Sequence, residues 1–105
     1  MAGPEATFRA LVGRVRHGKG TASPGLRAQA FDNHGLTPPL ETLIGKVATD
    51  PAAVTEADFA AAEAAGFSQD QLFELVICAA VGQSSRQYEA GLAALAEALG
   101  SDDAP

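Results

Sequence analysis

Two helix-start signals, thirteen residues apart in the second half of the chain, constrain its fold more than any other feature. In the first signal, Thr55 is a candidate N-cap. Asp58, three residues later, can accept the backbone N–H of Thr55, as in a capping box. Ser68 and Gln71 repeat the same pattern, and Gly66 between the two signals ends the first helix. The sequence therefore predicts a corner between two helices. This corner is structural and does not imply DNA binding.

The helix after the second signal is predicted to run from about Gln69 to Ala98, with Gly100 as its stop and 101–105 as a frayed tail. Gly82 and Gly91 in its interior each cost about 1 kcal/mol relative to alanine, so we expect close packing of another backbone or a bend at each. Apolar and small residues recur along the helix in steps of three or four, and we expect them to form its buried face. This face consists of Phe73, Ile77, Ala80, Ser84, Tyr88, Gly91 and Leu95.

Three shorter helices are predicted before the corner. Ser23 before Pro24 and Thr37 before Pro38 are good helix starts, because a side-chain oxygen caps the helix and proline fits its first turn. Residues 18–22 are expected to form a flexible link, and no stretch alternates like a β-strand. We therefore expect one all-α domain over 1–105, a small bundle of about five helices with a long C-terminal helix. The three expected helices are 5–16, with Phe8, Leu11, Val12 and Val15 on one side, 24–32, and 38–48.

The charge of the chain argues against nucleic acid and membranes as partners. The 105 residues carry a net charge of −6, and Arg86 is the only basic residue after Lys46. An acidic chain repels phosphate backbones and anionic lipids. The N-terminus lacks the basic region and apolar run of a signal peptide, and no stretch approaches the ~18 apolar residues of a membrane span. These features predict a cytoplasmic protein that binds neither nucleic acid nor membrane.

The single cysteine, Cys78, limits redox and metal chemistry. One thiol excludes an internal disulfide, a C-x-x-C pair and a cysteine-based zinc site, and it fits a reducing compartment. Glu74 lies one helical turn before Cys78, and a nearby carboxylate raises the pKa of a thiol and so weakens it as a nucleophile. Cys78 with Glu74 is therefore a weak thiol candidate, and a packed small side chain is the simpler interpretation.

Two other patterns resemble binding motifs but lack essential parts. Residues 13–19 match the first seven positions of a P-loop, yet Gly20 stands where that motif needs a hydroxyl for magnesium. His17 and His34 have no partner at metal-ligand spacing. The sequence therefore predicts no nucleotide site, no metal site and no cofactor.

Three polar residues, Ser84, Arg86 and Tyr88, interrupt the apolar part of the last predicted helix. One interpretation is structural: the serine bonds its own helix, and the arginine pairs across an interface. The other is a polar pocket that recognises a small acid. The sequence leaves both open.

Residues 40–99 resemble the carboxymuconolactone decarboxylase and alkylhydroperoxidase D-like superfamily. The resemblance lies in Pro38–Ile44, in Val54–Phe59 and, most clearly, in Ala64–Glu74. It implies an all-α fold that assembles as trimers or hexamers, with a C-x-x-C pair, a glutamate and a histidine in the peroxidase branch. Between Leu43 and Val54, where the redox helix of that branch lies, this chain has neither cysteine nor histidine. The resemblance therefore transfers no catalytic residue, and a C-x-x-C peroxidase is not expected.

The leading expectation is a non-redox relative of that superfamily that acts as a binding or assembly protein, as a homo-oligomer or as the small subunit of a larger enzyme. The long apolar face supports association, because exposed apolar patches usually mark interfaces. One alternative is a cofactor-free decarboxylase or isomerase with a pocket at a subunit interface. A degenerate thiol peroxidase that uses Cys78 is the weaker alternative.

Overall fold

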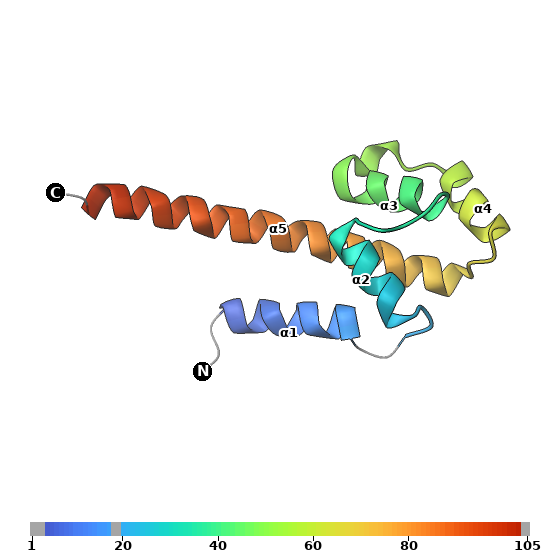
Figure 1. Cartoon of the computed structure of the whole chain (residues 1–105), viewed down its shortest axis with the longest axis horizontal. Helices are drawn as coiled ribbons and strands as arrows, with labels where there is room; N and C mark the ends of the chain where they lie inside the picture. The colour runs from blue at the N-terminus through green and yellow to red at the C-terminus, as the bar shows by residue number, and fades with distance from the viewer. Residues whose placement is uncertain (1–3, 18–19, 104–105) are drawn as a thin grey trace.

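The computed structural model describes residues 4–17 and 20–103, and these residues are almost entirely helical. Within these two ranges the chain forms five α-helices, one 3-10 turn and no strand, which confirms the all-α prediction. The long C-terminal helix is α5 (Figure 1). The elements are α1 (Pro4–His17), α2 (Pro24–Asp32), α3 (Leu40–Thr49), η1 (Pro51–Ala53), α4 (Glu56–Ala64) and α5 (Gln69–Asp103).

Helix α5 is the helix on which all the other helices pack. Helices α2, α3 and α4 contact its N-terminal half, and α1 contacts both α5 and α2 (Figure 1). The C-terminal part of α5 projects beyond the other helices as an arm, and the molecule measures 60 × 30 × 21 Å. The chain is therefore a small helical body at one end of a long helix.

The predicted helix starts are present where local side chains determine them. The Ser23 hydroxyl accepts a hydrogen bond from the Leu26 N–H at 3.2 Å. Ser68 and Gln71 bond each other reciprocally at 2.9 and 3.1 Å, and a capping box opens α4 at Thr55. These contacts confirm the predicted corner between α4 and α5.

The ion pair between Lys46 and Asp58 joins α3 to α4, at 2.9 Å between Nζ and Oδ2. The same carboxylate accepts the N–H of Thr55 at 2.9 Å, so one side chain serves both the cap and the ion pair. The Lys46 contact is the main reason why the pKa of Asp58 lies below its ordinary value.

Two predicted helix ends are shifted. Helix α3 begins at Leu40 and not at Pro38, because a residue that precedes a proline avoids helical backbone angles, and Pro38 precedes Pro39. Helix α5 continues past Gly100 to Asp103, so the predicted stop at Gly100 is wrong. The predicted side chains Phe8 and Val15, the side chains of 101–103, and residues 104–105 lie outside the described part of the chain.

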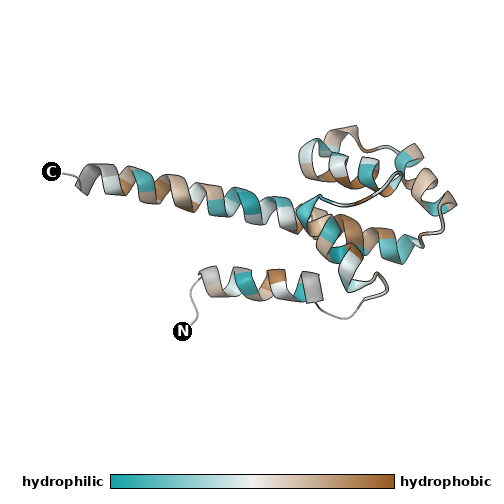
Figure 2. Ribbon diagram, in the orientation of Figure 1, coloured by the Kyte–Doolittle hydropathy of each residue, from teal (hydrophilic) through white to brown (hydrophobic). Residues whose placement is uncertain are grey.

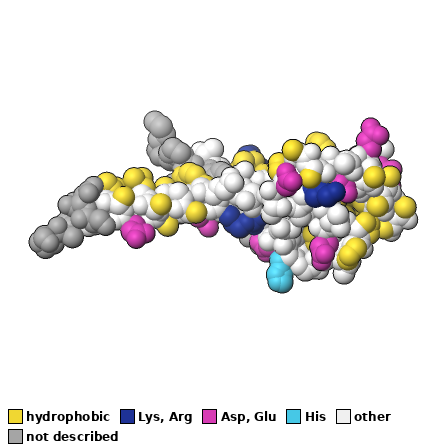
Figure 3. Space-filling model, turned by 90° about the horizontal axis from the view of Figure 1, so that it is seen from above, with side chains coloured by type: hydrophobic (Ala, Val, Ile, Leu, Met, Phe, Trp, Pro, Cys, Tyr) yellow, Lys and Arg dark blue, Asp and Glu magenta, His cyan; other side chains and the backbone are white. Residues whose placement is uncertain are grey.

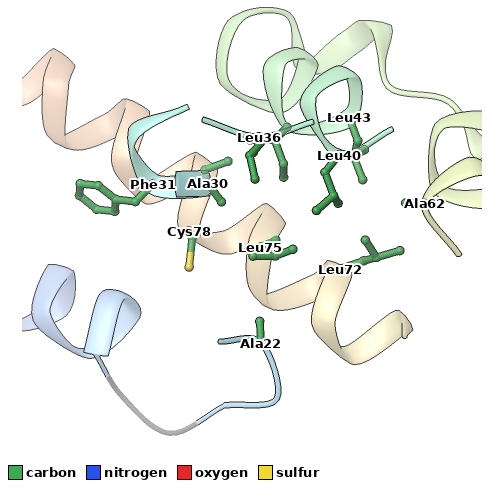
Figure 4. Close-up of a cluster of buried hydrophobic side chains, with 12 residues drawn as sticks. Ala22, Ala30, Phe31, Leu36, Leu40, Leu43, Ala62, Leu72, Leu75 and Cys78 are labelled. Atoms are coloured by element: carbon green, nitrogen blue, oxygen red, sulfur yellow. The ribbon is translucent and has the colours of Figure 1, made fainter. Parts of the chain in front are cut away.

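The core lies between the N-terminal half of α5 and the three helices packed on it (Figure 4). Ala79 is fully buried, and Gly82 faces α2, where an added Cβ would overlap the Phe31 carbonyl oxygen. A close backbone approach is therefore present at Gly82, whereas an added Cβ at Gly91 would meet nothing within 4 Å. The largest fully buried side chains are Leu43, Ile44, Leu72, Leu75 and Cys78.

The predicted buried face of α5 is wrong, because all seven of its residues are exposed. The buried positions of α5 follow a second line with the same helical spacing. Periodicity therefore identified an apolar face but could not decide which of two faces the body covers. The body takes the side on which Gly82 lets α2 approach, and it leaves out larger side chains such as Phe73, which is 67% exposed. The buried line is Leu72, Leu75, Cys78, Ala79, Gly82 and Ser85.

Candidate functional site

The exposed side of α5 is the main candidate for a functional surface. We call it the α5 face, and it consists of the seven residues Phe73, Ile77, Ala80, Ser84, Tyr88, Gly91 and Leu95, extended at the C-terminal end by Leu92 and Leu99. Leu95 is 55% exposed and Leu99 is 53% exposed. Hydrophobic positions continue from the packed half of α5 onto the projecting arm (Figures 2 and 3).

The α5 face contains no charged residue between Phe73 and Leu99, although Asp70, one turn before Phe73, lies on the same side of the helix. At 100° per residue, Glu97 lies about 180° and Glu89 about 100° around the helix from Tyr88. Arg86 points to α2, and Glu74 points to the loop before α2. From Phe73 to Leu99 the helix is therefore divided into an apolar side and polar sides. This division is typical of a helix that packs against another protein surface.

The arm consists of residues 87–100, each of which is exposed. The arm continues a folded helix, but with all of its residues exposed it has little of the tertiary packing that supplies most helical stability. The arm also carries Leu92, Leu95 and Leu99 on its surface. A helix with this composition gains most of its stability when its leucine side is covered.

A cavity of about 360 Å³ opens beside the N-terminal part of the α5 face. Phe73 belongs to both the cavity and the face. The lining is mainly apolar, so the cavity suits an apolar side chain. It is formed by Phe59, Glu63, Gln69, Leu72, Phe73 and Val76.

The polar residues singled out in the sequence do not share one pocket. Arg86 donates to the Phe31 carbonyl oxygen at 2.7 Å and to Gln83 Oε1 at 3.0 Å. It thereby caps the C-terminal end of α2, where carbonyl groups lack helical partners. Ser84 and Tyr88 instead lie on the exposed α5 face. This arrangement favours a structural role for Arg86 within the chain, in place of the expected pairing across an interface, over a pocket for a small acid.

Cys78 lies in the core and is 1% exposed. Its side chain points from α5 toward the side of α1 (Figure 4). Burial is the main reason why the pKa of Cys78 is raised; Glu74 raises it further, and Arg27 acts in the opposite direction. A thiol with a raised pKa that peroxide cannot reach is a poor nucleophile. The position fits the interpretation of Cys78 as a packed side chain.

Glu74 is held by the loop before α2. Its carboxylate accepts hydrogen bonds from the Thr21 N–H at 2.8 Å, the Thr21 hydroxyl at 2.7 Å and the Ala22 N–H at 2.7 Å. The Thr21 hydrogen bond is the main reason why the pKa of Glu74 lies below its ordinary value. A Cβ at Gly20 would overlap Glu74 Oε1. Residues 20–22 are therefore anchored to α5, and the flexible link predicted there is wrong; Gly18 and Lys19 lie outside the described residues.

Sequence reasoning missed two features of this region. The Glu74 anchor joins residues more than fifty positions apart, and no local pattern marks it. The second feature is the burial of Arg27, which is only 6% exposed. Its position between apolar-rich stretches gave no signal that the fold would bury it.

Metal and membrane sites find no support in the described part of the chain. Residues 4–17 and 20–103 contain no group of three or more histidine, cysteine, aspartate or glutamate side chains placed to hold a metal. No described helix is long and apolar enough to cross a bilayer. His34 is exposed just after α2, and Gly13 lies inside α1, whereas the His17 side chain is outside the described residues. The P-loop-like stretch is therefore helical at its first glycine.

Comparison with protein-family models, curated proteins and solved structures finds no match to this chain.

Proposed function

We propose that this chain is a binding or assembly protein that associates with another protein through the α5 face. The observation that carries the proposal is the position of this face: a charge-free apolar line runs along α5 and stays exposed from Phe73 to Leu99. Exposed apolar surface of this extent on a small protein usually marks an interface.

The size of the exposed surface supports the proposal. The chain exposes 6698 Å², whereas a compact monomer of its mass is expected to expose about 5,500 Å². Its radius of gyration is 16.5 Å, against about 13 Å for a compact domain of this length. The excess area is comparable to the roughly 800 Å² that each partner contributes to a standard protein interface.

The superfamily resemblance is part of this proposal. We propose that the chain has the helical corner of the carboxymuconolactone decarboxylase and alkylhydroperoxidase D-like proteins without their redox chemistry. The buried Cys78, with its raised pKa, supports a non-redox role. No second candidate function has an observation of comparable weight in its favour.

Photo-cross-linking in the native cells tests the proposal. A photoreactive amino acid replaces Leu95 in the full chain, and the control replaces Ala93, which is exposed on the same arm but lies about 160° around the helix. We expect a covalent protein adduct from position 95 and little or none from position 93. Equal adducts at both positions, or none at position 95, would contradict the proposal.

A further inference from the structure

We propose that the α5 face is covered by the α5 helix of a second copy, which lies antiparallel to the first about a two-fold axis near Arg86. This inference rests on the proposed function, because it names the partner of the same face. Five observations support it: register, side-chain size, helix length, the cavity and charge.

The register of the α5 face is the same in both directions. From the N-terminal end, Phe73, Ile77, Ala80 and Ser84 follow one another in steps of four, three and four residues. From the C-terminal end, Leu99, Leu95, Leu92 and Tyr88 follow in the same steps. An antiparallel copy therefore places four pairs at matching heights along both helices. A two-fold axis requires this kind of self-complementary surface.

Side-chain sizes are also complementary in this orientation. Near the axis, Ala80 faces the partner's Leu92, and Ser84 faces the partner's Tyr88, so a small residue meets a large one. Toward each end, Ile77 faces the partner's Leu95, and Phe73 faces the partner's Leu99. A parallel pair would instead set Ala80 and Ser84 against themselves and leave gaps between them. Alternation of large and small residues fills an interface to normal density.

The length of the arm matches the length of the body half of the face. Residues 73–86 lie in the half of α5 that carries the other helices, and 87–100 form the arm. An antiparallel copy lays each arm along the other body, so both halves are covered. The approach is open, because Cys78, which points toward α1, is about 120° around the helix from Ser84, and Gly82, which faces α2, is about 160° from it.

The cavity beside Phe73 lies where the partner's arm would end. In this register the partner's Leu95 and Leu99 pass Ile77 and Phe73, next to the lining residues Phe59 and Val76. A leucine side chain matches the apolar lining. The cavity is then one half of a composite site, and the second copy supplies the side chain that fills it.

Charge favours the antiparallel orientation over the parallel one. Each chain has a net charge of −6, and the arm carries Glu89 and Glu97 with no basic residue after Arg86. A parallel pair would bring both acidic arms together. An antiparallel pair places the acidic arms at opposite ends. It also sets the two helix dipoles antiparallel, so that the N-terminal end of each helix lies beside the C-terminal end of the other.

Paired cysteine substitutions test the orientation in the full-length protein. One preparation carries Ile77→Cys, a second carries Leu95→Cys, and the third is an equal mixture of the two, each under mild oxidation. In the antiparallel pair, two copies of position 77 are roughly 27 Å apart along the helix axis, whereas 77 faces 95. We expect a cross-linked dimer in the mixture only, and a mass of twice 10.7 kDa by light scattering for the unmodified protein.

The unmodified chain is the blank, because its only thiol is buried. A mixture of Ile77→Cys with Ala93→Cys is the matched control and should not cross-link. Circular dichroism checks the fold of each variant, and Ala80→Cys with Leu92→Cys replaces the first pair if Ile77→Cys unfolds.

Two outcomes would overturn the inference. Cross-linking of each single variant with itself would show a parallel pair. A mass of 10.7 kDa with no cross-link would show that a second copy does not cover the face. In the second case, a photo-adduct from position 95 with a different protein would leave the proposed function standing, so the two failures are distinguishable.

Discussion

At Gly82 the missing side chain allows the end of α2 to cross α5. An alanine there would press its Cβ against the Phe31 carbonyl oxygen, and a backbone atom cannot swing away as a side chain can. We expect Gly82→Ala to lower the free energy of unfolding by about 1–3 kcal/mol, as overpacked core substitutions do. Urea unfolding measures this change.

The control for Gly82 is Gly13, in the interior of α1, where an added Cβ meets nothing within 4 Å. Gly13→Ala should be neutral or stabilising by up to about 1 kcal/mol, because alanine loses less backbone entropy in a helix. Equal effects of the two substitutions would show that the α2–α5 approach is looser than described.

Cys78 is expected not to react with peroxide in the folded protein. A peroxidatic cycle needs a thiolate and then a second thiol to resolve the sulfenic acid. Burial raises the pKa of Cys78, and the chain has no other cysteine. With peroxide and a thiol reductant, the wild-type protein and Cys78→Ser should consume peroxide at the same background rate. Turnover that disappears in Cys78→Ser would restore the peroxidase interpretation.

At the scale of the elements, the sequence predicted the helices well and the packing of α5 poorly. The starts at Ser23 and Ser68 depend on side chains within three residues, so local patterns suffice to find them. The choice between the two apolar sides of α5 depends on how closely α2 approaches, which no local pattern records. The seven residues of the predicted face were therefore named from the sequence, but they were predicted to be buried, and the structure exposes them.

The anchor between Glu74 and residues 20–22 makes stability depend on pH. The pKa of Glu74 in the folded protein lies below its ordinary value of 4.5, so the folded state binds fewer protons than the unfolded state. The stabilisation is therefore complete above pH 4.5 and is lost as the pH falls through the folded-state pKa. Glu74→Gln should reduce the loss of stability in this acid range.

Urea midpoints measured from pH 7 downward would show this change. Glu89→Gln, which removes one exposed carboxylate from the polar side of α5, is the matched control and should keep the wild-type pH dependence. The pKa of Asp58 is also lowered, so Asp58 contributes the same loss of stability at acid pH in the wild type and in both variants. Identical curves for the wild type and Glu74→Gln would show that the loop contributes nothing.

At the scale of the whole molecule, the shape follows from the length of α5. The helix has 35 residues, and all of the residues 87–100 are exposed. The sequence predicted a long helix from the start signal at Ser68 to about Ala98, five residues short of its end at Asp103. It could not show that the helices before α5 would leave the second half of α5 uncovered, because that depends on where those helices dock.

The crossing of α2 over α5 also has an evolutionary consequence. One carbonyl group, that of Phe31, lies against the space left by Gly82 and accepts a hydrogen bond from Arg86 one turn later. A larger residue at 82 would push this carbonyl away and lengthen the reach of the arginine. Loss of the arginine would remove the hydrogen bond to the Phe31 carbonyl oxygen that the close crossing allows. Positions 82 and 86 are therefore expected to covary, so that related sequences without the glycine also lack the arginine.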